Sequence, residues 1–300
     1  MSGSKVLVIG KTGQVASALQ RSSAHSPLKY HFAGRDEVEL TSGLSMTKII
    51  QTSRPDLVIN CAAYTAVDKA EDEADLAKAV NETGPAVLAG LCSQVGIPLI
   101  HLSTDYVFAG DADRPYLETD AIQPGNSYGR SKAAGEAAVR DALSQHVIIR
   151  LAWVYGETGA NFFNTMLRLG RDKRELGIVN DQFGTPSYTG DIARVLDVVA
   201  TQVLEKPGST NWGTFHLTNE GVTSWYGFAR RIFELARMQG YPAVAVHPIS
   251  TADYPTPARR PAYSVLDCSK IKDQFEVNLR HWEDALFDCV EKKFDRAISF

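Results

Sequence analysis

Short, uninterrupted runs of Val, Ile and Leu recur through the first half of the chain and alternate with longer segments of helical spacing. Strands that are buried on both faces of a sheet have such continuous apolar runs, whereas half-exposed strands alternate. We therefore expect strands at residues 5–10, 29–34, 55–60, 98–103 and 146–155. The intervening helices are predicted near residues 14–22, 43–53, 72–95 and 128–145. This order predicts an α/β fold with a doubly wound parallel sheet and helices on both faces.

The second half of the chain has a less regular pattern. It adds one covering helix at residues 193–204 and one strand at residues 214–219. The remaining segments suit a smaller lobe, because they mix helical spacing with a proline-rich run: they lie near 161–172, 224–239, 254–263 and 281–296. We expect this lobe to be discontinuous in sequence and to pack over the strand ends of the sheet.

Composition narrows the classes of function. The chain has 300 residues, of which 44% are hydrophobic and 22% charged, as is usual for a soluble globular protein. Its formal net charge of −4 gives no basic excess, so we expect no nucleic acid and no anionic membrane as partner. We also predict no membrane span and no secretory signal, because no apolar run is long enough and the N-terminal segment enters a strand directly.

The spacing of the cysteines and histidines argues against a disulfide framework and a metal centre. Cys61, Cys92, Cys268 and Cys289 are far apart and form no C-x-x-C pair, which is typical of reduced thiols in a cytoplasmic protein. The seven histidines show no H-x₃-H or HExxH spacing. We therefore predict no protein-bound metal.

A glycine turn joins the first predicted strand to the first predicted helix, and it reads Gly10-x-x-Gly13-x-x-Ala16. Glycine allows a tight turn and a close approach of backbone to a pyrophosphate, and the small Ala16 lets the helix pack near the strand. The free N–H groups and the dipole at the helix N-terminus favour anionic phosphates. Such turns also occur without ligands, but the strand before it and the helix after it favour a Rossmann dinucleotide site.

The end of the second predicted strand bears on the cofactor. An acidic residue there suits the ribose 2′-hydroxyl of NAD, whereas an arginine suits the 2′-phosphate of NADP. Arg35 favours NADPH, but the adjacent Asp36 could serve NADH. The alternative is that Arg35 is only a solvated loop charge.

Tyr128 and Lys132 are four residues apart at the start of a predicted helix, in the segment "NSYGRSKAAGE". Because residues i and i+4 lie about 5–6 Å apart on one helical face, a lysine there is expected to lower the pKa of the phenol from about 10. Lowering it to about 7 requires roughly 4 kcal/mol, which needs the nicotinamide charge and a second hydrogen bond as well. Such a phenol can donate a proton to a carbonyl oxygen as hydride reaches the carbon. The alternative is an exposed helix with an incidental aromatic residue.

A third polar group is predicted near this pair. In "HLSTDYVFAG", Ser103 and Thr104 follow a strand, at the carboxyl edge where open α/β sheets bind ligands. A hydroxyl group there can hydrogen-bond the reacting oxygen. Ser and Thr are also common in ordinary strand-end turns.

These motifs together resemble the extended short-chain dehydrogenases/reductases and, more narrowly, the dTDP-4-dehydrorhamnose reductases. The resemblance covers nearly the whole chain, and the glycine turn and YxxxK are shared by the wider superfamily. The segments typical of the narrower group are "NCAAYTAVDKAE", "STDYVFAGD", "RLAWVYGETGANF", "VNDQFGTPSY" and "YPTPARRPAYSVLD". The resemblance implies hydride transfer from NADPH or NADH to the C4 ketone of dTDP-4-dehydro-β-L-rhamnose.

The resemblance also implies roles for individual residues. Tyr128 would donate the proton, Lys132 would hold the nicotinamide ribose and tune Tyr128, and Thr104 would bond the substrate oxygen. The further cofactor-binding residues, with Gly10 and Arg35 from the reasoning above, would be Gly13, Gln14, Val15, Glu39, Leu40, Ala63, Tyr64, Thr65 and Leu102.

Substrate contacts are expected from both halves of the chain. The predicted set is Thr104, Asp105, Tyr106, Trp153, Asn180, Gln182 and Arg259. Trp153 could instead fill the core at a strand end. Arg259, with its neighbour Arg260, could pair a diphosphate bidentately, because a guanidinium matches two phosphate oxygens.

We expect the chain to divide its two tasks between domains. Residues 1–155 with about 182–219 are predicted to form the NAD(P)-binding domain, and about 156–181 with 220–300 the nucleotide-sugar lobe. Some members of the group dimerise through a magnesium site that includes an acid on the first helix. Ala18 stands at that position, so the metal is not carried over, and both a monomer and a homodimer stay open.

Two alternative functions stay open. Related nucleotide-sugar dehydratases and epimerases share the glycine turn and YxxxK, but dehydratases need a carboxylate base where Tyr106 stands. Net consumption of NADPH would distinguish a reductase from both. The second alternative is a regulatory binding subunit, like the β subunit of methionine adenosyltransferase, which would co-purify with a partner and show no turnover.

Overall fold

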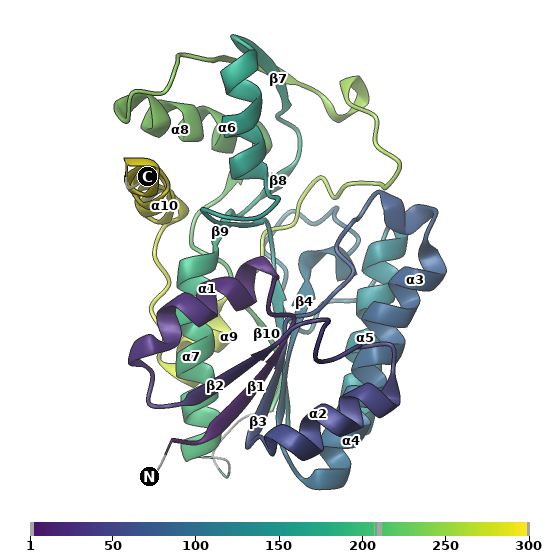
Figure 1. Ribbon diagram of the computed structural model, residues 1–300. Helices are drawn as coiled ribbons and strands as arrows, with labels where there is room; N and C mark the ends of the chain where they lie inside the picture. The colour runs from purple at the N-terminus through teal and green to yellow at the C-terminus, as the bar shows by residue number, and fades with distance from the viewer. Residues whose placement is uncertain (1–2, 207, 209–211, 299–300) are drawn as a thin grey trace.

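A six-stranded parallel sheet forms the centre of the protein in the computed structural model, which describes residues 3–206, 208 and 212–298 (Figure 1). The strand order is β10-β5-β4-β3-β1-β2. Every pairing in this sheet is parallel. The strands are β1 (Lys5–Ile9), β2 (Lys29–Ala33), β3 (Leu57–Asn60), β4 (Leu99–Thr104), β5 (His146–Leu151) and β10 (Gly213–His216). The predicted doubly wound sheet is confirmed.

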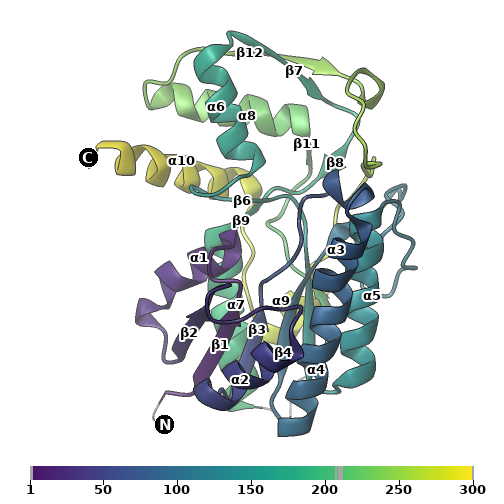
Figure 2. The ribbon, with the colours of Figure 1, turned by 45° about the vertical axis from the view of Figure 1, so that its right-hand side comes forward.

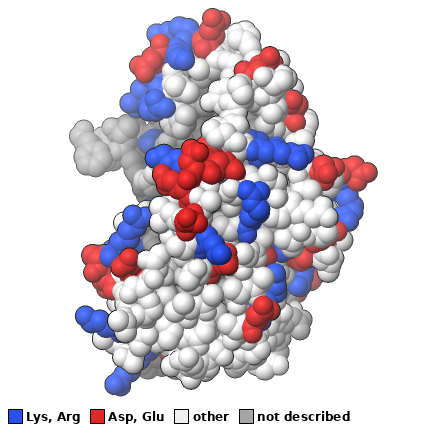
Figure 3. All heavy atoms as spheres, turned by 90° about the vertical axis from the view of Figure 1, so that its right-hand side faces the viewer, with Lys and Arg blue, Asp and Glu red and all other residues white. Residues whose placement is uncertain are grey.

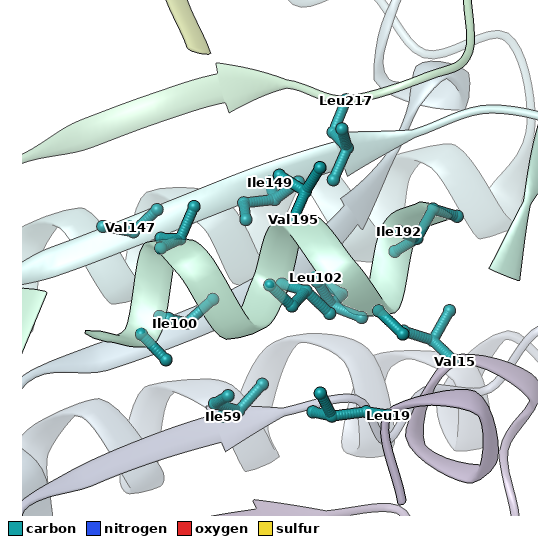
Figure 4. Close-up of a cluster of buried hydrophobic side chains, with 14 of the residues drawn as sticks. Val15, Leu19, Ile59, Ile100, Leu102, Val147, Ile149, Ile192, Val195 and Leu217 are labelled. Carbon is teal, nitrogen blue, oxygen red and sulfur yellow. The ribbon is translucent and has the colours of Figure 1, made fainter. Parts of the chain in front are cut away.

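Helices cover both faces of this sheet. One face carries α1 (Gln14–Ser22), α7 (Thr189–Glu205) and α9 (Ser269–Phe275). Their apolar side chains interdigitate with those of the strands, as Val15, Leu19, Ile192 and Val195 show in Figure 4. The other face carries α2 (Gly43–Ser53), α4 (Gly84–Val95) and α5 (Ser127–Ala142), and α3 (Ala74–Lys78) lies beside α5. Continuous apolar strands are therefore buried from both sides, as their sequences predict.

A second group of elements lies beyond the carboxyl ends of the strands (Figures 1 and 2). It contains α6 (Phe162–Asp172), α8 (Trp225–Met238) and α10 (Trp282–Ile298), which share an apolar core rich in aromatic residues. The short strands β7 (Glu175–Val179) and β12 (Ala245–Ile249) pair in parallel. Two more pairs join β8 (Phe183–Gly184) to β11 (Thr223–Ser224) and β6 (Val154–Tyr155) to β9 (Ser187–Tyr188).

The structure corrects the predicted strand at residues 146–155. β5 ends at Leu151, and β6 pairs outside the central sheet. The break lies at Trp153, whose backbone is left-handed with φ +47°, a region that non-glycine residues seldom occupy. The Trp153 indole stacks on Trp225 with ring centroids 3.4 Å apart. This contact between the two groups of elements holds the backbone where a straight strand would not pass.

Two predicted helices also differ in extent. The segment predicted near 72–95 comprises α3, a π-helical turn at Ala79–Thr83 and α4, and the helix predicted to reach 145 ends at Ala142. The sequence prediction missed the pair β7–β12 and the helix α9. The other helix predictions agree within a few residues.

None of the helices that the structure describes is long and apolar enough to cross a membrane. On the face over α3 and α5, acidic and basic side chains lie interspersed (Figure 3). The four cysteines, which all lie within the described residues, are free thiols.

Candidate active site

The glycine turn after β1 brings backbone close to the loop that follows β3. Gly10 has φ +101°, and a Cβ atom there would lie only 2.7 Å from the Ala62 backbone nitrogen, so no side chain fits. Helix α1 begins at Gln14 without a side-chain cap and without an acidic residue in its first turn. Its first N–H groups are thus suited to hydrogen-bond the oxygens of a pyrophosphate.

Gln14 ties this turn to the loop before α6. Its side-chain oxygen accepts a hydrogen bond from the Asn161 amide at 2.7 Å. The next residue, Val15, is buried in the core between α1 and the sheet, so only its backbone faces the turn. Ala18, one turn further on, is also buried. Among the described residues, no cluster of His, Cys, Asp and Glu is arranged to hold a metal ion.

A further group of residues considered for cofactor binding lies after β2. Arg35 is exposed at the strand end, next to the exposed Asp36. Glu39 is exposed as well and accepts a hydrogen bond from the Thr41 hydroxyl. Leu40 has its side chain in the core against Gly84, so it can offer a ligand only its backbone.

The loop after β3, which contains Ala63, Tyr64 and Thr65, is fixed by a buried asparagine. The Asn81 amide accepts from the Tyr64 backbone N–H at 2.8 Å and donates to the Tyr64 carbonyl at 3.0 Å. The same amide nitrogen donates to the Ser131 hydroxyl on α5. Asn81 therefore links this loop to the helix that carries Tyr128 and Lys132.

Helix α5 lies unusually close to the π-helical turn before α4. A Cβ atom at Gly135 would lie 1.9 Å from the carbonyl oxygen of Asn81, so only glycine permits this approach. The Asn126 side chain caps the start of the helix by accepting from the Gly129 N–H at 2.8 Å. These contacts hold the helix and its functional groups over the carboxyl ends of the strands.

Thr104, Asp105 and Tyr128 meet at the end of β4. The Thr104 hydroxyl donates to the Asp105 carboxylate at 2.9 Å. Burial raises the pKa of the Tyr128 phenol, and a hydrogen bond with Thr104 opposes that rise. Burial likewise raises the pKa of Asp105 to about 6, although hydrogen bonds with Thr104 and Ser264 oppose that rise. The Tyr106 ring packs edge-on against Tyr128, with centroids 5.6 Å apart.

Lys132 points into the sheet and is fully buried. Its ammonium donates to the Leu102 carbonyl at 2.7 Å, and its Nζ lies 3.4 Å from His101 Nε2. Burial lowers the pKa of Lys132 to about 8. The predicted lowering of the Tyr128 pKa by this lysine is not seen in this structure, because burial dominates at the phenol. The Tyr128 group is therefore a protonated acid at neutral pH.

The predicted substrate residues are distributed over a wider area. Trp153 is half-buried and stacked on Trp225. Asn180 is exposed and accepts a hydrogen bond from the Ser224 hydroxyl at 2.7 Å. Gln182 is buried and donates to the Thr251 hydroxyl at 3.0 Å, so its amide nitrogen is already engaged within the protein.

The two arginines of "TPARRP" have different surroundings. Arg259 is exposed and lines a surface pocket of about 480 Å³ together with Arg130 and Asp111. Arg260 is engaged: it pairs with Asp68 at 2.6 Å and donates to the Tyr106 hydroxyl at 3.0 Å. Arg259 is thus the better placed of the two for an anionic ligand.

Sequence reasoning missed the buried polar groups under α5. His101 and Asn60 are fully buried in β4 and β3, and Glu136 and Arg150 form a buried ion pair at 2.7 Å. The available signal was a polar residue inside an otherwise apolar strand, as in "LVIN" and "LIHLS". A buried polar group in such a strand requires a partner, which identifies it as part of a network.

The parallel sheet, the glycine turn and the convergence of Thr104, Tyr128 and Lys132 at one strand end define a class: a Rossmann-fold oxidoreductase of the short-chain dehydrogenase/reductase type. The family model described as "RmlD substrate binding domain" matches residues 4–294. The chain belongs to this family.

Comparisons with single proteins agree with the family. A dTDP-4-dehydrorhamnose reductase of Sinorhizobium fredii is 41% identical over 94% of this chain and 95% of its own length. A dTDP-4-dehydrorhamnose reductase structure from Clostridium acetobutylicum has a TM-score of 0.88 and 38% identity, over 96% of this chain and 99% of that one. A third, from Bacillus anthracis in complex with NADP, has a TM-score of 0.89 and 34% identity, over 97% and 99%.

Proposed function

We propose that this protein reduces the C4 ketone of dTDP-4-dehydro-β-L-rhamnose to dTDP-β-L-rhamnose, the last step in the synthesis of this sugar donor for polysaccharides. The observation that carries the proposal is the meeting of Thr104, Tyr128 and Lys132 at the carboxyl end of β4 in a chain of this family. Relatives about 40% identical over nearly the full chain bear the name of this activity.

Tyr128 supplies the proton. Because its phenol is protonated at neutral pH, it can donate to the ketone oxygen as that oxygen gains negative charge. Thr104, which donates to Asp105 and lies beside Tyr128, orients the phenol; its single hydroxyl hydrogen can be donated to the ketone oxygen only once it leaves Asp105. When bound, the reduced nicotinamide supplies the hydride.

The cofactor is NADPH, with NADH as the second donor to be tested. The glycine turn and the uncapped start of α1 fit its pyrophosphate, and Arg35 is exposed where a 2′-phosphate would lie. The Bacillus anthracis relative, which was solved with NADP, supports this choice. Tyr64, with Ala63 and Thr65, belongs to the loop that Asn81 holds beside the cofactor site.

The nucleotide sugar is bound between the two groups of elements. Residues 1–155 and about 182–219 hold the cofactor in this proposal, and about 156–181 with 220–300 hold the substrate. Arg259 is the candidate for the diphosphate, because its guanidinium is exposed beside Arg130. Tyr106 borders the sugar, since its ring packs against Tyr128. Trp153, between β5 and β6, is the second candidate for this role.

The test is a spectrophotometric assay that follows the loss of absorbance as NADPH or NADH is oxidised. The keto sugar is generated in place by the upstream dehydratase and epimerase, and NADPH and NADH are supplied separately. We expect oxidation that requires the epimerase and yields dTDP-L-rhamnose, faster with NADPH. Folded protein that binds NADPH yet turns over no keto sugar would overturn the proposal.

A further inference from the structure

Lys132 has a neighbour that the reaction outlined above does not use. His101 lies beneath it in β4, is fully buried, and is therefore uncharged at neutral pH, since burial and the nearby ammonium keep the pKa of the ring well below its usual value. A neutral imidazole carries one hydrogen, on either Nδ1 or Nε2. The position of this hydrogen decides whether Nε2 is a hydrogen-bond donor or an acceptor toward Lys132.

The hydrogen bonds of Asn60 settle the position of that hydrogen. The Asn60 side-chain oxygen accepts from the Ala62 backbone N–H at 3.1 Å, which fixes the orientation of the amide. The amide nitrogen of Asn60 then faces His101 Nδ1 at 3.1 Å and can only donate. Nδ1 is the acceptor, so the ring hydrogen lies on Nε2 and points at Lys132.

This arrangement suits an amine better than an ammonium. An Nε2–H group can donate to the lone pair of a neutral Lys132, whose own N–H still donates to the Leu102 carbonyl at 2.7 Å. A charged Lys132 has no lone pair and would place two donors against each other across 3.4 Å. His101 Nε2 could become an acceptor for the ammonium only if the Asn60 side-chain amide flipped and lost its hydrogen bond with the Ala62 N–H.

One charged group near Lys132, Glu136, acts in the opposite direction. Glu136, one turn further along α5, favours the ammonium, but its charge is largely engaged by Arg150 at 2.7 Å and Arg140 at 3.2 Å. Tyr128 on the same helix is uncharged at neutral pH. The equilibrium between the amine and the ammonium form of Lys132 is therefore set by three factors. Burial and His101 favour the amine, and Glu136 favours the ammonium.

We propose that Asn60 and His101 are positioning residues that make Lys132 a ready proton donor: by presenting a ring N–H to it, they favour the neutral amine. The inference rests on the proposed reduction, in which each turnover removes one proton from Tyr128. Lys132 gives up a proton so that the phenol is restored, becomes the amine that His101 stabilises, and regains the proton from solvent.

Asn60→Asp is the sharpest test, because it replaces only the side-chain amide nitrogen by oxygen. A carboxylate accepts from His101 Nδ1–H, so the ring hydrogen moves to Nδ1 and Nε2 becomes an acceptor for the ammonium. We expect the basic limb of the pH profile of kcat to move up by at least about one pH unit. An unmoved limb in folded Asn60→Asp protein would overturn the proposal.

The negative charge that Asn60→Asp introduces needs its own control. In the His101→Leu background the carboxylate is still present but the ring is not, so Asn60→Asp should shift the limb by less than half as much. An equal shift in both backgrounds would assign the effect to charge alone and reject the role of the ring. Thermal melting of all four proteins reports whether each is folded.

A measurement without turnover separates this inference from the proposed function. Nitrogen NMR of histidine-labelled protein distinguishes the two tautomers, and His101→Gln identifies the signal. We expect the Nε2–H form in the wild-type protein and the Nδ1–H form in Asn60→Asp. A wild-type Nδ1–H signal would overturn the inference even if ketone reduction is found, and the expected signals would stand even if it is not.

Discussion

Lys132 and Glu136 lie one turn apart on the same face of α5, and both are completely buried, yet they are surrounded very differently. The Glu136 carboxylate receives two hydrogen bonds from Arg150 and one from Arg140. Its pKa stays below the usual value although burial acts to raise it. Lys132 has one carbonyl and one histidine nitrogen, and burial lowers its pKa to about 8.

The difference separates a structural charge, that of Glu136, from one to which we assign a function in proton transfer, that of Lys132. A buried charge that is fully paired holds its protonation state and its position, whereas an underpaired one can change protonation near neutral pH. The Glu136 network extends through Arg150 to His216 on the edge strand and anchors α5. The Lys132 amino group, in contrast, has fewer partners and can exchange a proton near neutral pH.

The largest effect is expected on the functional side. Tyr128→Phe removes the acid while keeping the ring against Tyr106, so kcat should fall by about 10²–10⁴-fold with the melting temperature nearly unchanged. Steady-state kinetics with saturating cofactor measure this. The matched control is Tyr106→Phe, which loses only a bond to Arg260 and should lose less than about fivefold. Equal losses in both would remove Tyr128 from its role.

On the structural side, Arg150→Met should destabilise the fold by about 3–5 kcal/mol, because it leaves the Glu136 carboxylate buried without its main partner. Urea denaturation gives the free energy of unfolding. Arg140→Met removes a half-exposed partner of the same carboxylate and should change it by less than about 1 kcal/mol. Similar losses of unfolding free energy in the two variants would mean that the burial of the arginine does not decide how much its ion pair with Glu136 contributes to stability.

Stability should also depend on pH through Lys132. The folded pKa of about 8 lies below the usual 10.5, so between these values the unfolded chain holds a proton that the folded protein has released. Stability relative to Lys132→Met should therefore rise by up to about 3 kcal/mol from about pH 8 to about pH 10.5 and be flat below that range. Urea titrations of both proteins across this range measure the difference, and a flat difference throughout would show that Lys132 is not desolvated.

The smallest effect is expected at an exposed charge. Arg35→Ala should raise the KM for NADPH by about tenfold and leave that for NADH within about twofold, since only NADPH offers a phosphate to pair. Parallel titrations of the two cofactors measure this. An equal rise of both KM values would show that Arg35 does not bind the 2′-phosphate. Asp36 would then be the residue to change next.

The central sheet could be predicted well from the chain, because continuous apolar strands are typical of sheets with both faces covered. The break at Trp153 could not be predicted, since it depends on a stacking partner far along the chain, Trp225. The weakly apolar strand β12 carries a proline and has mostly exposed residues, so its pattern gives little signal.

The residues of the candidate site stay a prediction, and sequence spacing indicated only part of their geometry. Spacing placed Tyr128 and Lys132 on one helical face, but spacing does not fix the direction of a long side chain. Lys132 turns into the sheet because the Leu102 carbonyl and His101 lie there. The partners of a buried ammonium depend on three-dimensional neighbours, which is why the pKa of Tyr128 was expected to fall when burial raises it.

The close approach of Gly135 to the Asn81 carbonyl has a consequence for protein engineering. Loops that we propose to border the substrate, such as the one carrying Arg259, can be varied widely in a search for new sugar specificity. Position 135 cannot, because any larger residue would push α5 away from the π-helical turn at Ala79–Thr83 and move the proposed proton donor with it. A library that randomises the loops and keeps this glycine would explore new substrates without losing the chemistry.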